Sequence, residues 1–191
     1  MDSRIETLSA IFAKTAPLLS AVRASDLTLP TPCGEYNLAA VLSHIAVWVQ
    51  VFDASVNDAT YDFDPATHKI SQGWAEIFDS SSARIVDGLR TRGFHRPMKM
   101  TSSSLPGEFV LNMVLMEYIG HGWDICRTTH QPTPYSDHEA TVALAASEAI
   151  LAPQYRGTGM FEAAVDVPAN ATPMEAFVAF LGREPYWSAS V

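Results

Sequence analysis

The sequence predicts an all-α protein: an up-down four-helix bundle followed by extra, shorter C-terminal helices. Two observations lead to this prediction. Four long segments repeat apolar residues at helical spacing, and the stretches between them carry prolines and glycines. The length of 191 residues suits one domain with a full core, so we expect a single domain over residues 1–191.

The four long helices each have a boundary signal or an interruption. We expect them at about residues 6–23, 38–55, 69–92 and 108–131. Pro17 is expected to kink or divide the first, because proline removes a helical hydrogen bond. Asn37 is the expected N-cap of the second. Gly93 supplies the stop of the third, and Pro132 follows the end of the fourth.

The connecting segments are rich in helix-breaking residues. Residues 29–36 hold two prolines and a glycine, so this connector is expected to be extended. Residues 56–68 form an acidic loop, and residues 94–106 an irregular stretch or a short extended crossover. Within the latter, the tract starting at Thr101 is expected to be flexible.

Two weaker helices are expected in the last third of the chain. Ser136 or Asp137 caps one that runs to about residue 151. Thr172, followed by Pro173 at the first helical position, caps the other through residue 181. Residues 157–167 between them are expected to form a loop or a short strand.

Composition excludes several classes of protein. Hydrophobic residues make up 48% and charged residues 17%, as in an ordinary soluble globular protein, and we expect no bilayer-spanning run. Residues 1–6 carry acids where a secretory leader needs positive charge, which favours the cytoplasm. The two cysteines show no disulfide spacing. A net charge of −9 and a pI near 5.0 argue against nucleic-acid binding.

The fourth helix carries the strongest functional signal. At about 100° per residue, Glu117 and His121 lie one turn apart on the face that also carries Val110, Met113 and Val114. An acid and an imidazole on an inward face need a partner, because buried charge is costly unless it is paired or binds a metal. The pair is either structural and hydrogen-bonded or part of a metal site.

His44 on the second helix also points inward, sharing a face with Val41, Trp48 and Val51. Taken alone, such a histidine is more often a core residue that bonds a backbone carbonyl. Together with Glu117 and His121 it makes a His₂Glu set. Three protein ligands plus an open position are typical of catalytic zinc, whereas structural zinc is closed by four.

Neighbouring residues of the fourth helix leave alternatives open. In one interpretation Asp124 accepts a hydrogen bond and so orients His121 or a water bound to the metal. In the other, Asp124 forms a salt bridge with Arg127. In a helix interior, Gly120 and Gly122 each lower helix stability by about 0.8–1.0 kcal/mol relative to alanine. Their presence is explained either by close contact between helices or by clearance for a substrate beside the metal.

The remaining histidines and the cysteines are weaker candidates. We expect the histidines outside the set to be exposed: His68, His95, His130 and His138. A reactive thiol at Cys33 is conceivable, but a small buried filler fits better, and Cys126 is expected to be packing. No phosphate loop or Ser/Cys–His nucleophile motif stands out.

Three stretches resemble a known family: PTPCGEYNLAAVLSHI at residues 30–45, EFVLNMVLMEYIGHGWDICRTTHQPTP at 108–134 and FVAFLGREP at 177–185. In this order they resemble the DinB-like metalloprotein superfamily, in the actinobacterial branch similar to the N-terminal domain of mycothiol-dependent maleylpyruvate isomerase. The resemblance covers nearly the whole chain. The connector departs from it, reading Cys-Gly-Glu-Tyr-Asn where relatives tend to have Pro-Gly or Pro-Asp, then Trp and Thr or Ser.

The resemblance implies a DinB-like four-helix bundle that binds a divalent metal, usually zinc and sometimes nickel. Its metal ligands fall on His44, Glu117 and His121. Better-studied relatives use low-molecular-weight thiols such as mycothiol in isomerisation or S-transfer. No thiol-binding residue can be assigned from a motif.

Three functions stay open on the sequence. One is a metal-dependent thiol transferase or isomerase, in which the metal deprotonates mycothiol for attack on a small electrophile. Another is a thiol-independent hydrolase that uses metal-bound water, with Asp124 as proton acceptor. The third is a non-catalytic metal- or thiol-binding stress protein, which a fourth ligand such as Cys33 would favour. Zinc suits the ligand set, although Ni²⁺ or Fe²⁺ also fits. We expect a monomer or homodimer, with no nucleic-acid or membrane partner.

Overall fold

A computed structural model describes residues 2–34, 36–157 and 161–189. It confirms the all-α prediction: the long elements are helices, and a small two-stranded sheet is added to them. The helices are α1 (Ser3–Ser20), α2 (Leu38–Asn57), α3 (Trp74–Arg92), α4 (Gly107–Thr129), α5 (Asp137–Ile150) and α6 (Pro173–Phe180). Short 3₁₀ turns lie at Ala24–Asp26 and Pro153–Tyr155.

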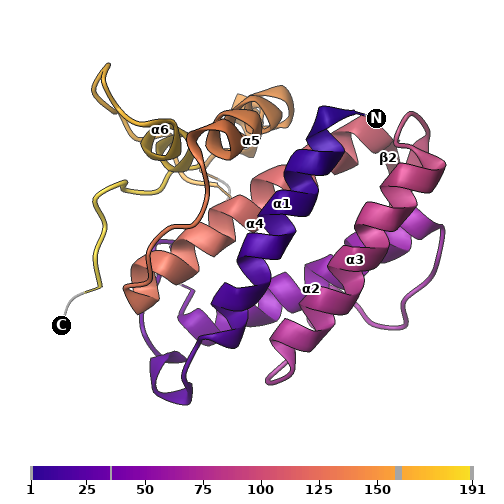
Figure 1. Ribbon diagram of the computed structural model, residues 1–191, viewed down its shortest axis with the longest axis horizontal. Coiled ribbons are helices and arrows are strands. Elements are labelled where there is room, and N and C mark those ends of the chain that lie inside the picture. The colour runs from indigo at the N-terminus through magenta and orange to yellow at the C-terminus, as the bar shows by residue number, and fades with distance from the viewer. Residues whose placement is uncertain (1, 35, 158–160, 190–191) are drawn as a thin grey trace.

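Helices α1 to α4 form the predicted bundle (Figure 1). Both α1 and α2 pack against α3 and α4. Each helix contributes one aromatic ring to the centre: Phe12, Phe52, Phe78 and Tyr118. Their edge-to-face contacts have ring centroids 5.2 to 6.1 Å apart. Such pairs add about 0.5–1.5 kcal/mol each to the burial of the rings, so this cluster fixes how the four helices meet.

The predicted caps are present. The Asn37 side chain accepts a hydrogen bond from the backbone N–H of Ala40 at 2.9 Å, which starts α2. Ser136 and Thr172 each form a capping box at the start of α5 and α6. Gly93 ends α3 with a φ of 69°, in the region that glycine tolerates best.

Two helix boundaries differ from the prediction. Helix α3 begins at Trp74 and not at residue 69, because Gly73 has a φ of 73° and the backbone before it cannot be helical. Helix α1 begins at Ser3, where Asp2 caps it, and continues past Pro17 to Ser20. Proline removes only one hydrogen bond near the last turn, which does not divide the helix.

Residues 97–106 form a hairpin, so the stretch expected to be either irregular or a short extended crossover is extended here. Strand β1 (Pro97–Met100) pairs antiparallel with β2 (Ser103–Pro106). Thr101 at the turn has a φ of 48°. Met98 and Met100 are buried, so burial on one face holds the hairpin against the bundle.

Helix α2 is long and apolar enough to cross a membrane by length and composition, with a mean hydropathy of 1.5 in its most apolar window. This corrects the expectation that no run reaches that length. However, 67% of that window is buried inside the bundle. Packing against α3 and α4 accounts for the apolar composition, as in the core helix of a soluble protein.

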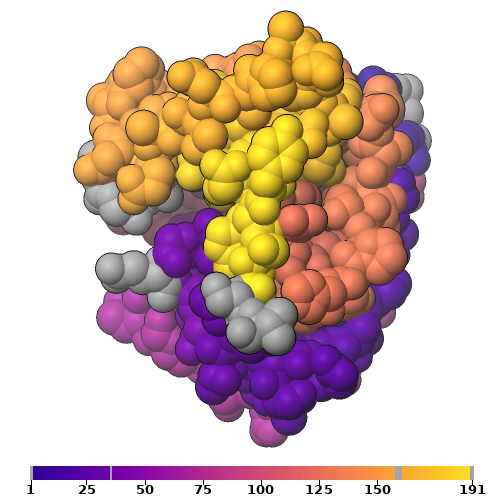
Figure 2. Space-filling model, turned by 90° about the vertical axis from the view of Figure 1, so that its left-hand side faces the viewer, coloured from indigo at the N-terminus to yellow at the C-terminus, as the bar shows by residue number. Residues whose placement is uncertain are grey.

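The C-terminal part packs on one side of the bundle. Helix α5 lies against α4, and α6 lies against α5. The segment after α6 then returns to α4, where the Arg127 Nε donates a hydrogen bond to the Trp187 carbonyl at 2.9 Å. Figure 2 shows this yellow segment lying against purple residues of the stretch between α1 and α2. The return of the chain brings late residues to the end of α4.

Candidate metal centre

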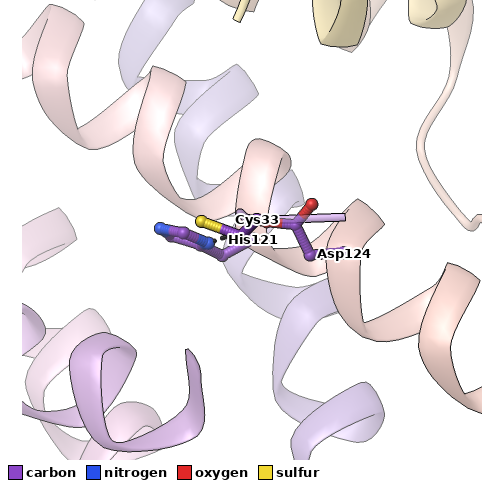
Figure 3. Close-up of side chains that lie close together, drawn as sticks. All are labelled: Cys33, His121 and Asp124. Atoms are coloured by element: carbon purple, nitrogen blue, oxygen red, sulfur yellow. Dashed lines mark hydrogen bonds and ion pairs between the residues drawn. The ribbon is translucent and has the colours of Figure 1, made fainter. Parts of the chain in front are cut away.

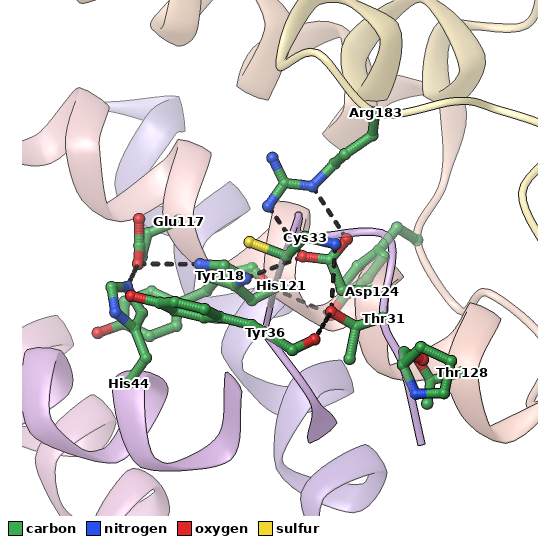
Figure 4. Close-up of polar contacts among 12 residues, drawn as sticks. Thr31, Cys33, Tyr36, His44, Glu117, Tyr118, His121, Asp124, Thr128 and Arg183 are labelled. Carbon is green, nitrogen blue, oxygen red and sulfur yellow. Dashed lines mark hydrogen bonds and ion pairs between the residues drawn. The ribbon is translucent and has the colours of Figure 1, made fainter. Parts of the chain in front are cut away.

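Helices α2 and α4 bring the three predicted ligands together (Figure 4). The Nε2 of His121 lies 3.3 Å from Oε1 of Glu117, and the Nε2 of His44 forms a hydrogen bond with the same oxygen. One donor atom from each residue lies within 4.8 Å of the others. The imidazole rings of His44 and His121 meet edge to face with centroids 4.9 Å apart.

This arrangement fits a divalent cation. Zinc binds histidine nitrogen and carboxylate oxygen at about 2.0–2.2 Å, so ligand atoms of one tetrahedral ion lie about 3.3–3.6 Å apart. The 3.3 Å between His121 and Glu117 matches that spacing. Exposure of the side chains rises from 8% at His121 to 16% at Glu117 and 26% at His44. The set is therefore most exposed to solvent on its α2 side.

The charges within the set support each other. Burial alone would raise the pKa of Glu117, but the two imidazoles hold that pKa well below its usual value. Burial would lower the pKa of His121, yet the Glu117 carboxylate and Asp124 raise it well above the usual value. A bound metal cation would take the place of the imidazole proton as the positive partner of the Glu117 carboxylate.

Asp124 lies on the other side of the His121 ring. Its Oδ2 accepts a hydrogen bond from Nδ1 of His121 at 2.9 Å, so Nδ1 carries a proton and Nε2 points toward Glu117 and His44, where it would offer its lone pair to a cation that displaces its own proton. A carboxylate on the far nitrogen of a ligating histidine fixes its tautomer and ring orientation. The geometry is that of the orienting residue suggested by the sequence.

The salt-bridge partner of Asp124 is Arg183, and the alternative of Arg127 is wrong. Nε and Nη2 of Arg183 donate to the two carboxylate oxygens at 2.9 and 2.8 Å. Burial opposes ionisation of Asp124, but this guanidinium lowers the pKa of the carboxyl group below its usual value. The guanidinium of Arg127 donates to the Trp187 carbonyl instead.

Sequence reasoning missed Arg183 as part of the site. It follows Gly182, whose φ of 85° turns the chain back toward α4 directly after α6. The arginine belongs to the FLGREP stretch that carries the family resemblance. That motif was the available signal, because a charged residue next to a helix end in a conserved-looking stretch invites a search for a buried partner.

The connector places Cys33 beside the site, which corrects the expectation of a buried filler. The thiol is half-buried and contacts the imidazole of His121 (Figure 3). Thr31 holds the turn, because its Oγ1 accepts from the Cys33 N–H at 3.2 Å and donates to the Tyr36 carbonyl at 2.7 Å. An isolated bridge between Pro30 and Asn37 closes the connector at its ends.

Aromatic side chains border the open side of the set. The ring of Tyr36 lies 6.1 Å from that of His44, and the ring of Trp48 lies at the same distance on another side. Tyr36 is 45% exposed. Aromatic rings from the connector and from α2 therefore lie beside His44.

Packing explains the two glycines that flank His121. A Cβ on Gly122 would lie 1.7 Å from the Tyr135 hydroxyl, and one on Gly120 would lie 3.1 Å from a methyl group of Leu181. The interpretation as close contact is therefore correct. The alternative, clearance for a substrate, is wrong, since neither glycine faces the donors.

The remaining sequence candidates lie where they were expected. The four histidines outside the set are exposed: His68, His95, His130 and His138. Cys126 is buried and its thiol donates weakly to the Pro132 carbonyl at 3.6 Å. These residues do not join the site.

Comparison with known proteins identifies a family and two similar proteins. Residues 8–126 match the family described as the mycothiol maleylpyruvate isomerase N-terminal domain. Uncharacterized proteins from two strains of Mycobacterium tuberculosis are each 30% identical over 175 residues, which span 88% of this chain and 91% of theirs. No solved structure matches. The family match contains the connector and the helices that carry His44, Glu117 and His121.

Proposed function

The chain belongs to the mycothiol maleylpyruvate isomerase N-terminal domain family, within the DinB-like proteins, and from this premise we propose that it is a metal-dependent thiol S-transferase or isomerase. Its thiol would be mycothiol or a similar low-molecular-weight thiol, and its second substrate a small electrophile. Three donors with one solvent-facing side are the observation that carries the proposal.

His44, Glu117 and His121 would hold the cation, with Zn²⁺ as the best fit to two imidazoles and a carboxylate. When bound, a divalent cation at these donors acts as a Lewis acid that promotes loss of the thiol proton, so that the nucleophilic thiolate exists at neutral pH. Structural zinc sites normally have four protein ligands. The three helix donors with an open side therefore favour a catalytic role over a purely structural one.

The other residues of the site prepare these donors. Asp124 keeps the proton on Nδ1 of His121 and so keeps the Nε2 lone pair directed at the cation. Arg183 balances the charge of Asp124, which is completely buried. Tyr36 and Trp48 would exclude bulk water and give the electrophile an apolar surface beside the donors.

Hydrolysis is the weaker alternative because it would need a free base near the open side. Asp124 was the candidate for that role. Both its oxygens bond Arg183, and one of them also accepts from His121. A carboxylate with these partners is a poor proton acceptor, so the thiol reaction has the better support.

The C-terminal part belongs to the same working unit in this proposal. Arg183 follows α6, and its partner Asp124 lies in α4, 59 residues earlier. We therefore propose that residues 1–191 act as one domain. The negative net charge of −9 favours small-molecule substrates over a nucleic-acid partner, and we place this enzyme in the cytoplasm.

The test combines metal content with thiol-dependent turnover. Untagged protein is analysed for metals, loaded with Zn²⁺, and assayed for conjugation of a halogenated bimane to mycothiol. We expect one bound cation and conjugation that needs both metal and thiol. His121→Ala should abolish both, whereas His138→Ala, on an exposed histidine, should change neither.

Each outcome has a defined meaning. Unchanged conjugation in His121→Ala, or in protein stripped of metal, contradicts the proposed function. Turnover of an ester or amide without any thiol supports the hydrolase. Stoichiometric metal binding without turnover of any of these probes supports a binding protein.

A further inference from the structure

Of the two cysteines, Cys33 lies beside the donor set, whereas Cys126 is packed against Pro132. The side chain of Cys33 lies between the ring of His121 and the guanidinium of Arg183 (Figure 4). Its Sγ, a nitrogen of His121 and an oxygen of Asp124 all lie within 4.8 Å of one another. Two groups of potential metal ligands therefore share His121.

The group formed by Cys33, His121 and Asp124 is not a second cation site. The Asp124 carboxylate is fully buried and both its oxygens are bonded to Arg183. The Nδ1 of His121 is bonded to the same carboxylate. A cation there would have to break all three hydrogen bonds and bury its charge beside a guanidinium. These bonds leave two donor atoms free, the Cys33 thiol and Nε2 of His121, and Nε2 already lies with the donors of Glu117 and His44.

We propose that Cys33 provides a fourth, sulfur ligand to the cation held by His44, Glu117 and His121 when no thiol substrate is bound. This inference rests on the metal site of the proposed function. The Sγ lies within 4.8 Å of a nitrogen of His121, which is itself one of the three ligands, so the thiol stands next to the donor set. Cysteine sulfur binds zinc as a thiolate, and Arg183 lies close enough to balance that charge.

The location of Cys33 makes this ligand replaceable. The three other donors are held by α2 and α4, whereas Cys33 lies on the connector, whose turn is fixed by two hydrogen bonds of Thr31. The thiol is also half-buried and so within reach of solvent. A weakly held ligand closes the site without making it structural.

The exchange with a substrate thiol is balanced. The bond between the cation and Sγ of Cys33 breaks, and a bond to the sulfur of the incoming thiol forms. The proton that the incoming thiol loses passes to the Cys33 sulfur, so neither the net charge nor the number of protons changes. A thiol would thus replace Cys33 more readily than water or an oxygen ligand would, which gives the site a preference for thiols.

Cobalt provides a direct test, because a sulfur ligand on Co²⁺ produces an intense charge-transfer absorption in the near ultraviolet that nitrogen and oxygen ligands lack. The full chain is loaded with one equivalent of Co²⁺ in the absence of any thiol. We expect this absorption in the wild type and in Cys126→Ser, and its loss in Cys33→Ser and Cys33→Ala. Circular dichroism of each variant checks that the helices are intact.

Titration of mycothiol into the cobalt-loaded variants completes the test. In Cys33→Ser the absorption should return as the thiol binds. Wild-type protein that binds Co²⁺ but shows no sulfur absorption before thiol is added overturns the inference and leaves the proposed function standing. Failure of the wild type to bind Co²⁺ or Zn²⁺ at all overturns the proposed function itself.

Discussion

Replacing Arg183 by methionine should destabilise the protein far more than the loss of an average ion pair. The guanidinium donates two hydrogen bonds, at 2.9 and 2.8 Å, to a carboxylate that is completely buried. Methionine fills a similar volume, so the main effect is an uncompensated charge on Asp124. Removing one partner of a buried ion pair costs about 3–5 kcal/mol. In a chain of this size each kcal/mol lowers the melting temperature by about 2–4 °C, so we expect a fall of about 6–20 °C.

The measurement is thermal and urea unfolding of the metal-free protein at pH 7, with Arg90→Met as the matched control. Arg90 binds Glu6 at 2.7 Å, but both side chains are substantially exposed, at 38% and 50%. Loss of that pair should leave the melting temperature nearly unchanged, because solvent screens exposed charges. Equal melting temperatures for the two variants would refute the reasoning from burial.

The same variant should also bind Zn²⁺ less tightly. Without Arg183, it becomes favourable for the Asp124 carboxylate to take up a proton or for its side chain to move. In either case Asp124 no longer fixes the orientation of the His121 ring. Loss of such an orienting partner typically lowers metal affinity about 10–100-fold. Chelator competition measures this change, and Arg90→Met again serves as the control.

Two further predictions concern the helix that carries Glu117 and His121. Because the pKa of His121 is raised in the metal-free protein, a cation must displace its proton, so the apparent Zn²⁺ affinity should rise with pH up to that raised pKa. Calorimetry in buffers of different ionisation enthalpy should show proton release, and an affinity independent of pH would contradict the assignment. Gly122→Ala places a Cβ 1.7 Å from the Tyr135 hydroxyl and should lower stability in urea unfolding by about 1–3 kcal/mol, despite the better helix propensity of alanine. Gly120→Ala, with 3.1 Å to a flexible methyl group, should lower it much less, and equal losses would argue against the packing explanation.

Local sequence pattern was sufficient for the helices and for the three donors. Helical periodicity depends only on residues three or four positions apart, so α2 and α4 and the faces of His44 and Glu117 could be predicted without any tertiary contact. Caps such as Asn37 are equally local. This is why the bundle and the convergence of its donors followed from the sequence.

Long-range contacts could not be predicted in the same way. The pair between Asp124 and Arg183 joins residues 59 positions apart, and Arg127 was the nearer basic residue on the helix. The hairpin at residues 97–106 depends on cross-strand pairing and on burial against the bundle, which short-range pattern does not encode. The cost of Gly120 and Gly122 was visible in the sequence, but its cause lies in side chains of distant segments.

In the proposed function, metal binding and substrate choice fall to different parts of the chain. The donors are fixed by the two helices that also build the core, whereas Cys33 and Tyr36, which border them, come from a connector closed by the bridge between Pro30 and Asn37. Loops of this kind change without loss of the scaffold beneath them. This connector is also a place where the sequence departs from the pattern that it otherwise resembles. Natural variants of the fold can therefore acquire new substrates by altering one short surface loop, and exchanging that loop between homologues is a direct route to engineered selectivity.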